Sequence, residues 1–200
     1  MSSRDVILGR VRAALAGAAP PGPVPRAYRR TSGPADLDLL VDRLTDYRAV
    51  VYRTGDVPAT VAGILVEGAT VVVPPGLPAG WLPPTVTARP DDGLSIDDIA
   101  AADAVLTAAA VAVAETGTIV PDAGPDQGRR LLSLLPDRHI CVLRPDQVVA
   151  SVPEAIARLD PRRPLTWISG PSATSDIELE RIEGVHGPRN LHVILLAPPA

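Results

Sequence analysis

The sequence contains no lysine, no phenylalanine and a single cysteine, and two of these shortages exclude a class of chemistry. Without lysine, the chain cannot form a Schiff base or hold a phosphate with the lysine of a P-loop. One cysteine, Cys141, can make neither an internal disulfide nor the four-cysteine ligand set of an iron–sulfur cluster. Because Cys141 lies in the apolar run 140–143, we expect it to be a small buried residue.

Other common signatures are also missing. The net charge is -4 and there is no long run of arginines, so we expect no nucleic-acid partner. The Gly-x-Gly-x-x-Gly fingerprint of dinucleotide-binding folds is absent. No apolar run reaches the roughly 18 residues of a membrane helix, and Arg10 and Arg12 interrupt the apolar positions near the start. We therefore expect a cytoplasmic protein without a membrane span.

What the chain has in quantity is aliphatic side chains and proline. Hydrophobic residues make up 46% and aromatic residues 2%, so the core must consist of valine, leucine, isoleucine and alanine. Residues 1–17 have the apolar spacing of an amphipathic helix, and the proline-rich residues 18–34 are expected to form an extended linker. The compact domain is expected to cover residues 35–200.

From residue 35 onward, the apolar pattern alternates between helix and strand periods. This order predicts crossover units and a mostly parallel sheet, hence an α/β fold. Within 104–120, a Thr-Gly turn with Glu115 at the bend predicts a hairpin or a bent strand pair. The expected helices are 37–44, 57–67, 127–135, 152–159 and one that Ser175 and Glu178 cap and Gly184 ends. The other expected strands are 49–52, 70–73, 138–143, 165–168 and 191–196, and residues 76–95 are expected to be irregular.

Glu115 is the first candidate for a reactive group. It stands in the turn Glu115-Thr116-Gly117 between apolar residues, where a desolvated carboxylate could act as a nucleophile or general base. The alternative is a solvated glutamate on a surface turn. Thr116 and Gly117 are candidate ligand-binding residues of the same turn.

A second candidate site follows the apolar run 165–168. Gly170, Ser172, Thr174 and Asp176 belong to a segment of small, hydroxyl and acidic side chains, which suits ligand binding at a helix N-terminus. Asp176 and Glu178 would repel a phosphate there and could instead hold a divalent cation through water. The alternative is a well-capped helix that needs no ligand.

Histidine and arginine supply the remaining candidates. His186, followed by Gly-Pro, could be an acid or base near neutral pH, or a loop residue bonded to backbone. Arg129 and Arg189 are candidate anchors for a carboxylate, and a solvated surface position is the alternative. His139 and His192 lie in or beside apolar runs and are expected to be structural. Three scattered histidines and one cysteine show no zinc spacing, so no metal site is expected.

Together these motifs resemble the LUD domain family. The resemblance covers roughly residues 35–197, is strongest after residue 102, and rests on the order and spacing of the motifs. It implies a three-layer α/β/α, Rossmann-like domain with a mostly parallel sheet, similar to the phosphosugar isomerase and CoA-transferase group. The segments that carry it are 107–114, Glu115-Thr116-Gly117-Thr118, 129–136, His139, 169–178 and Gly184-Val185-His186-Gly187-Pro188.

The resemblance also implies a function. The cellular role of this family is the oxidation of L-lactate to pyruvate, together with two partner proteins that carry iron–sulfur clusters. With one cysteine, this chain resembles the accessory subunit without a cluster, a component of a lactate-oxidising complex rather than an independent catalyst. The resemblance assigns it no cofactor of its own. Its ligand is expected to be a small carboxylate or a nucleotide, unless the site is a partner surface.

An alternative function follows from the kinship with CoA-transferases. Class I CoA-transferases carry a catalytic glutamate beside a glycine-containing turn, and Glu115-Thr116-Gly117 looks like that arrangement. On this hypothesis the chain is a stand-alone CoA-transferase-like or isomerase-like enzyme for a small acyl or sugar-phosphate substrate, with Glu115 as nucleophile or base. Thr116 departs from the polar amide or small residue expected at that place.

Overall fold

A six-stranded, all-parallel sheet forms the centre of the molecule, in the order β1-β11-β7-β4-β2-β3. The computed structural model describes residues 2–19, 22–175, 181–183 and 187–197. The α/β prediction with a mostly parallel sheet is therefore confirmed. The strands are β1 (Val50–Thr54), β2 (Thr70–Val73), β3 (Thr87–Pro90), β4 (Ala104–Ala108), β7 (Arg138–Leu143) and β11 (Asn190–Leu196).

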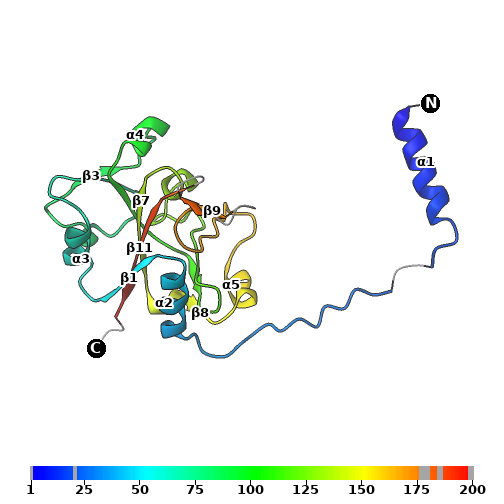
Figure 1. Ribbon diagram of the computed structural model, residues 1–200, viewed down its shortest axis with the longest axis horizontal. Coiled ribbons are helices and arrows are strands. Elements are labelled where there is room, and N and C mark those ends of the chain that lie inside the picture. The colour runs from blue at the N-terminus through cyan, green and yellow to red at the C-terminus, as the bar shows by residue number, and fades with distance from the viewer. Residues whose placement is uncertain (1, 20–21, 176–180, 184–186, 198–200) are drawn as a thin grey trace.

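Successive residues of β7 show how the two faces of this sheet are covered. Ile140 and Val142 pack with α3 on one face, and Cys141 and Leu143 pack with α2 on the other. All four side chains are buried, as expected for a central strand whose two faces are both covered. Figure 1 shows these two helices on either side of the central strands. The helices on the sheet are α2 (Leu37–Asp46), α3 (Val57–Ile64) and α4 (Ile96–Ala100).

A smaller sheet lies on the same face as α2. Its hairpin strands are β5 (Val111–Val113) and β6 (Thr118–Val120), and β8 (Val148–Val149) pairs parallel to β5. Helix α5 (Val152–Arg158) packs behind this sheet through Ala155, against Val111 and Val113. The hairpin predicted around Glu115 is thus present, with Glu115 in its turn.

The N-terminal part of the chain projects from the domain. Helix α1 (Ser3–Leu15) begins at a capping box in which Ser2 and Asp5 bond each other's backbone N–H groups, and none of its residues is buried. An extended segment then leads to the domain (Figure 1). It meets the domain where Arg29 lies 3.5 Å from the Glu115 carboxylate and the Ser32 N–H donates to Glu154 at 2.6 Å. The division into a helix over 1–17, a linker over 18–34 and a domain over 35–200 stays a prediction.

Several local predictions are wrong. Residues 165–168 are not a strand: Ile168 alone forms a two-bond bridge with Ile119, at 2.8 and 2.9 Å. Ser175 does not begin a helix, because it belongs to β9 (Ala173–Ser175), which pairs antiparallel with β10 (Arg181–Glu183). Residues 76–95 contain β3 and a short 3₁₀ helix, Ala79–Trp81. The helix expected at 127–135 is a 3₁₀ turn, Arg130–Ser133.

Candidate functional site

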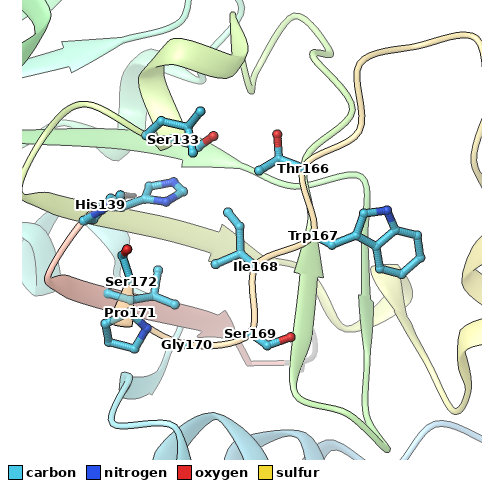
Figure 2. A pocket seen from close by; sticks show the side chains of 13 residues that line it. Ser133, His139, Thr166, Trp167, Ile168, Ser169, Gly170, Pro171 and Ser172 are labelled. Atoms are coloured by element: carbon cyan, nitrogen blue, oxygen red, sulfur yellow. The ribbon is translucent and has the colours of Figure 1, made fainter. Parts of the chain in front are cut away.

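A cavity of about 260 Å³ lies over the α2 face of the sheet, near the start of β7 and β11. His139 and Leu191 line the cavity from these two strands. The segment 166–172 runs across it (Figure 2). The residue pair His139–Leu191 is in register between the two strands, so the sheet itself fixes this side of the cavity. The covering segment is held to the small sheet by the Ile168–Ile119 bridge.

The lining of the cavity is uncharged but rich in hydroxyl groups. Ser133, Thr166, Ser169 and Ser172 contribute hydroxyls, and Leu134, Ile168 and Leu191 contribute apolar surface. No arginine, aspartate or glutamate is among the described residues that line it. The described part of the lining therefore offers hydroxyl groups for hydrogen bonding next to apolar surface.

His139 is the most unusual group in this cavity. Its side chain is fully buried, and its Nε2 lies 2.8 Å from the Thr107 hydroxyl oxygen. Its Nδ1 is buried without a hydrogen-bond partner among the described residues. Burial lowers the pKa of His139 from 6.5 to about 4, so the ring is neutral at pH 7. An unpaired buried nitrogen costs on the order of 1–3 kcal/mol of folding free energy.

Behind His139, buried polar side chains continue along the sheet. Thr107 lies opposite Cys141 in the β4–β7 pairing. Burial raises the pKa of that thiol to about 12, so it keeps its proton at neutral pH. Cys141 is therefore an inert donor or acceptor, consistent with the buried cysteine expected from the sequence.

A second row of hydroxyls joins the cavity to the hairpin turn. The Thr116 and Thr118 hydroxyl oxygens are 2.8 Å apart, and Thr118 is 2.8 Å from the Ser169 hydroxyl. Ser169 lines the cavity, while Thr116 and Thr118 lie behind it. Gly117, in the same turn, has φ +60°, and a Cβ there would be 2.7 Å from the Cβ of Arg43 in α2. Its conformation explains the glycine without a ligand.

Gly170 and Ser172 are the two predicted ligand-binding residues that the structure brings to the cavity. Gly170 has φ +82°, and a Cβ there would come within 2.5 Å of the Tyr47 Cβ. The Ser172 N–H donates to the Pro188 carbonyl at 2.8 Å, which closes one end of the cavity. Thr174 lies in β9, and Asp176 and His186 lie outside the described residues.

Glu115 lies at the N-terminus of α5 and does not line this cavity. One carboxylate oxygen accepts the N–H of Val152, the first residue of α5, at 3.2 Å. The other faces the Arg29 guanidinium. A carboxylate at a helix N-terminus accepts a hydrogen bond from a free backbone N–H and interacts favourably with the helix dipole. These contacts therefore account for Glu115 as a capping group.

The two arginines predicted to anchor a carboxylate already have carboxylate partners. Arg129 donates to both oxygens of Asp91, at 2.7 and 2.5 Å, and to the Leu94 carbonyl at 2.9 Å. Arg189 donates to Asp137 at 2.5 Å, which holds the pKa of that carboxyl below its usual range. Arg129 borders a different cavity, of about 350 Å³, formed with Gly76 and Gly128 beyond the carboxyl end of β2.

Sequence patterns missed the part of the site that His139 and Thr107 supply. Thr107 is the one polar residue of β4, and His139 follows Arg138 at the start of an otherwise apolar strand. Both patterns also occur in ordinary cores. No group of three or more potential metal ligands occurs in the part of the chain that the structure describes. Within the same residues, no helix is long and apolar enough to cross a membrane.

This combination defines a Rossmann-like α/β domain with a small uncharged cavity on one face of its sheet. The chain belongs to the LUD domain family, whose model matches residues 89–196. It is 46% identical to Lactate utilization protein C of Deinococcus radiodurans, over 95% of this chain and 93% of that protein. The protein of that name from Exiguobacterium sp. is 37% identical, over 48% of this chain and 44% of its own length.

A solved structure supports the same fold. The crystal structure of a DUF162 family protein from Deinococcus radiodurans is similar to this one, with a TM-score of 0.69 and 41% sequence identity. The similarity covers 80% of this chain and 96% of that chain. The resemblance predicted from the motifs is thereby confirmed at the level of family and fold.

Proposed function

We propose that this chain works in lactate utilization, as an accessory component without an iron–sulfur cluster. The observation that carries the proposal is the 46% identity, over nearly the whole of both chains, to a protein named Lactate utilization protein C. The alignment spans both the α/β domain and most of the N-terminal segment, so the likeness is not limited to one shared module.

In this proposal, partner proteins with iron–sulfur clusters carry out the redox step. Oxidation of L-lactate to pyruvate removes two electrons and two protons, which an acceptor must take up. This chain has one cysteine, buried and protonated, and no dinucleotide fingerprint. We therefore assign the acceptors to the partners, in the cytoplasm, where an unpaired thiol persists.

The chemistry of the cavity supports an accessory role over direct lactate oxidation. The lactate carboxylate would need a cation, and none of the described lining residues is charged. Arg129 and Arg189 are each engaged by an aspartate. A small carboxylate or a nucleotide phosphate would therefore have to bind this chain elsewhere, or at an interface with a partner.

Reconstitution tests the proposal directly. Lactate-dependent reduction of a dye is measured with the purified chain, with the two iron–sulfur partners, and with all three together. Activity that requires the complete mixture, or that rises at least about tenfold when the chain is added, is the expected result. Activity of the chain alone would contradict the accessory role and favour the stand-alone enzyme. If the partners are fully active without the chain, the chain takes no part in the reaction.

A further inference from the structure

The cavity of about 350 Å³ lies beyond the carboxyl ends of β2 and β4, where the chain leaves the sheet toward opposite faces. These two strands are parallel neighbours. The segment that follows β2 packs with α3 through Leu77, whereas the segment that follows β4 packs with α2 through Ala112. Open parallel sheets bind their ligands in the crevice at such a point, because the two diverging connections leave space between them.

The loop 121–129 closes this crevice and is fixed to both strands. The Ala108 N–H, at the end of β4, donates to the Asp126 carbonyl at 2.9 Å. The Gly76 N–H, beyond the end of β2, donates to the Pro125 carbonyl at 2.9 Å. A Cβ on Gly76 would be 2.7 Å from Pro125, so the two loops approach more closely than a side chain there would allow. The cavity is therefore built into the fold.

The same loop contains a strained residue. Ala123 lines the cavity and has φ 58°, a conformation that is unfavourable for a residue with a Cβ. Such strain persists only where the surrounding structure holds it, and it occurs preferentially at sites that bind a ligand. The backbone at Ala123 thus supports, independently of the sheet topology, a binding site at this place.

Arg129 supplies the positive charge of the cavity, and its side chain is accessible, with 43% of its surface exposed. Asp91 and the Leu94 carbonyl accept hydrogen bonds from its Nε and Nη2 atoms. The N–H groups of Nη1 donate to no acceptor in the part of the chain that the structure describes. The ion pair with Asp91 therefore orients the guanidinium and leaves one nitrogen for a ligand that enters from solvent.

The charges favour a singly charged anion. Asp91 and Arg129 are the charged residues among the described residues that line the cavity. The Asp91 side chain is only 2% exposed, so an entering group meets the guanidinium and not the carboxylate. The nearby carboxylate still compensates part of the positive charge, which disfavours a dianion such as phosphate relative to a carboxylate.

The rest of the lining suits a small carbon skeleton. Pro75, Ala123 and Pro125 contribute apolar surface beside Arg129. The volume of about 350 Å³ is near the lower end of the range of roughly 300–1,000 Å³ that is typical of ligand pockets. An organic acid with a few carbon atoms therefore fits this cavity.

We propose that this cavity binds the carboxylate of a small organic acid, with Nη1 of Arg129 as the hydrogen-bond donor. The inference goes beyond the proposed role in lactate utilization and does not rest on it, because it concerns small carboxylates as a class. It makes Arg129 a ligand-binding residue as well as the partner of Asp91.

Amide NMR of the full chain at pH 7 tests the proposal. The probes are acetate, propionate and L-lactate, with lactamide as the uncharged match of L-lactate. At least one carboxylate should shift the amide signals of Gly124 and Gly128, which line the cavity, in a saturable manner. If L-lactate is among those that bind, lactamide should bind at least about tenfold more weakly, because it lacks the charge. No saturable shift from any carboxylate overturns the proposal, as does lactamide binding equal to that of L-lactate. Tighter binding of inorganic phosphate than of every carboxylate would refute the assignment to a carboxylate.

A matched pair of substitutions locates the binding. Pro125 lines the cavity and is exposed, so it can be replaced without disturbing the core. Pro125→Glu adds a negative charge and should weaken carboxylate binding about tenfold. Pro125→Gln has the same shape without the charge and should leave affinity within about twofold. Unchanged amide signals of Gly170, which lines the other cavity, verify that the fold is intact. Equal affinities of the two variants would place the carboxylate elsewhere.

A second pair tests Arg129 itself. Arg129→Lys keeps a positive charge beside Asp91 but has no Nη1, so affinity should fall at least about fivefold. Arg130→Lys, next in the chain and exposed, makes the same chemical change outside the cavity and should have no effect beyond about twofold. Undiminished binding by the Arg129 variant would contradict the role assigned to its guanidinium.

Discussion

Arg129 holds the nearly buried carboxylate of Asp91 by two parallel N–H donors, at 2.7 and 2.5 Å. The Asp91 side chain is only 2% exposed, whereas that of Arg129 is 43% exposed. The pair ties the start of the 3₁₀ turn 130–133 to the end of β3, which are far apart in the sequence. Its geometry is that of a structural clamp on a buried charge.

Replacing Arg129 with alanine should therefore destabilise the domain. The change leaves the Asp91 carboxylate buried without its partner, at a cost of about 2 kcal/mol, reduced from the fully buried case because Arg129 is part-exposed. Urea unfolding measures the loss. Arg130→Ala, next in the chain and exposed, is the matched control and should cost less than about 0.5 kcal/mol. Equal effects of the two substitutions would show that the clamp contributes nothing.

The substitution Glu115→Gln tests whether Glu115 only caps α5 or also takes part in catalysis. The amide keeps an oxygen that can accept the Val152 N–H, so stability should fall by less than about 1 kcal/mol, and Glu115→Ala should cost more. If Glu115 only caps α5, lactate-dependent dye reduction in the reconstituted mixture stays within about twofold. A loss of about a thousandfold in a folded variant would instead support the nucleophile hypothesis. Glu154→Gln, at the same helix end, is the control.

His139 makes stability depend on pH in a defined direction. The unfolded chain takes up a proton near pH 6.5, and the folded chain only near pH 4. Between these values the unfolded state binds more protons, so stability is lost as the pH falls. Urea unfolding at pH 7 and pH 5 should differ by about 2 kcal/mol. Using His192→Gln in both measurements removes the second histidine whose pKa burial lowers. Equal stability at the two pH values would contradict the burial of a neutral His139.

The division into a helix (1–17), a linker (18–34) and a domain (35–200) is tested by two truncations. Removing residues 1–17 should change the melting temperature of the domain by less than about 1 °C, because α1 buries no residue. Removing residues 1–34 also deletes the contacts of Arg29 and Ser32, and should lower it by about 2–4 °C. A large effect of the shorter truncation would show that α1 packs on the domain in solution.

The elements that could be predicted are those whose apolar pattern is continuous and buried. Residues 70–73 and 138–143 were expected as strands and form β2 and β7 with those bounds. Both lie inside the sheet, where neighbours cover both faces. After their first polar residues, Thr70 in β2 and Arg138 and His139 in β7, both sequences are apolar. Strand β3 was missed because it is a partly exposed edge strand that ends in Pro90, which resembles irregular structure.

The wrong predictions come from local signals that distant contacts override. Ser175 and Glu178 have the spacing of a capping box, yet Ser175 pairs with Arg181 in an antiparallel ladder. The apolar run 165–168 has strand composition, but only Ile168 forms a β-bridge, and Thr166 makes a single backbone hydrogen bond to Pro121. Propensity decides little when a remote segment supplies the hydrogen bonds.

The cavity could be predicted only in part for a related reason. Gly170 and Ser172 stand out in the sequence because small residues cluster there. The local sequence of His139 indicates a buried histidine. Nothing near it indicates that a segment about thirty residues later lines a cavity together with it. Whether a buried side chain is packed or faces a cavity depends on tertiary structure, which apolar periodicity does not record.

The place of β11 in the sheet has a consequence for biosynthesis. This strand, from residues 190–196, lies between β1 and β7, so β1 at the sheet edge is joined to the other strands through β11. During translation β1 and α2 emerge early and must wait for nearly the whole domain to be made. Until residues 190–196 leave the ribosome, the edge of β7 and the apolar side of α2 lack their native cover. The nascent chain is therefore expected to depend on chaperones late in synthesis, and a stop codon shortly before β11 should yield an aggregating product rather than a smaller folded domain.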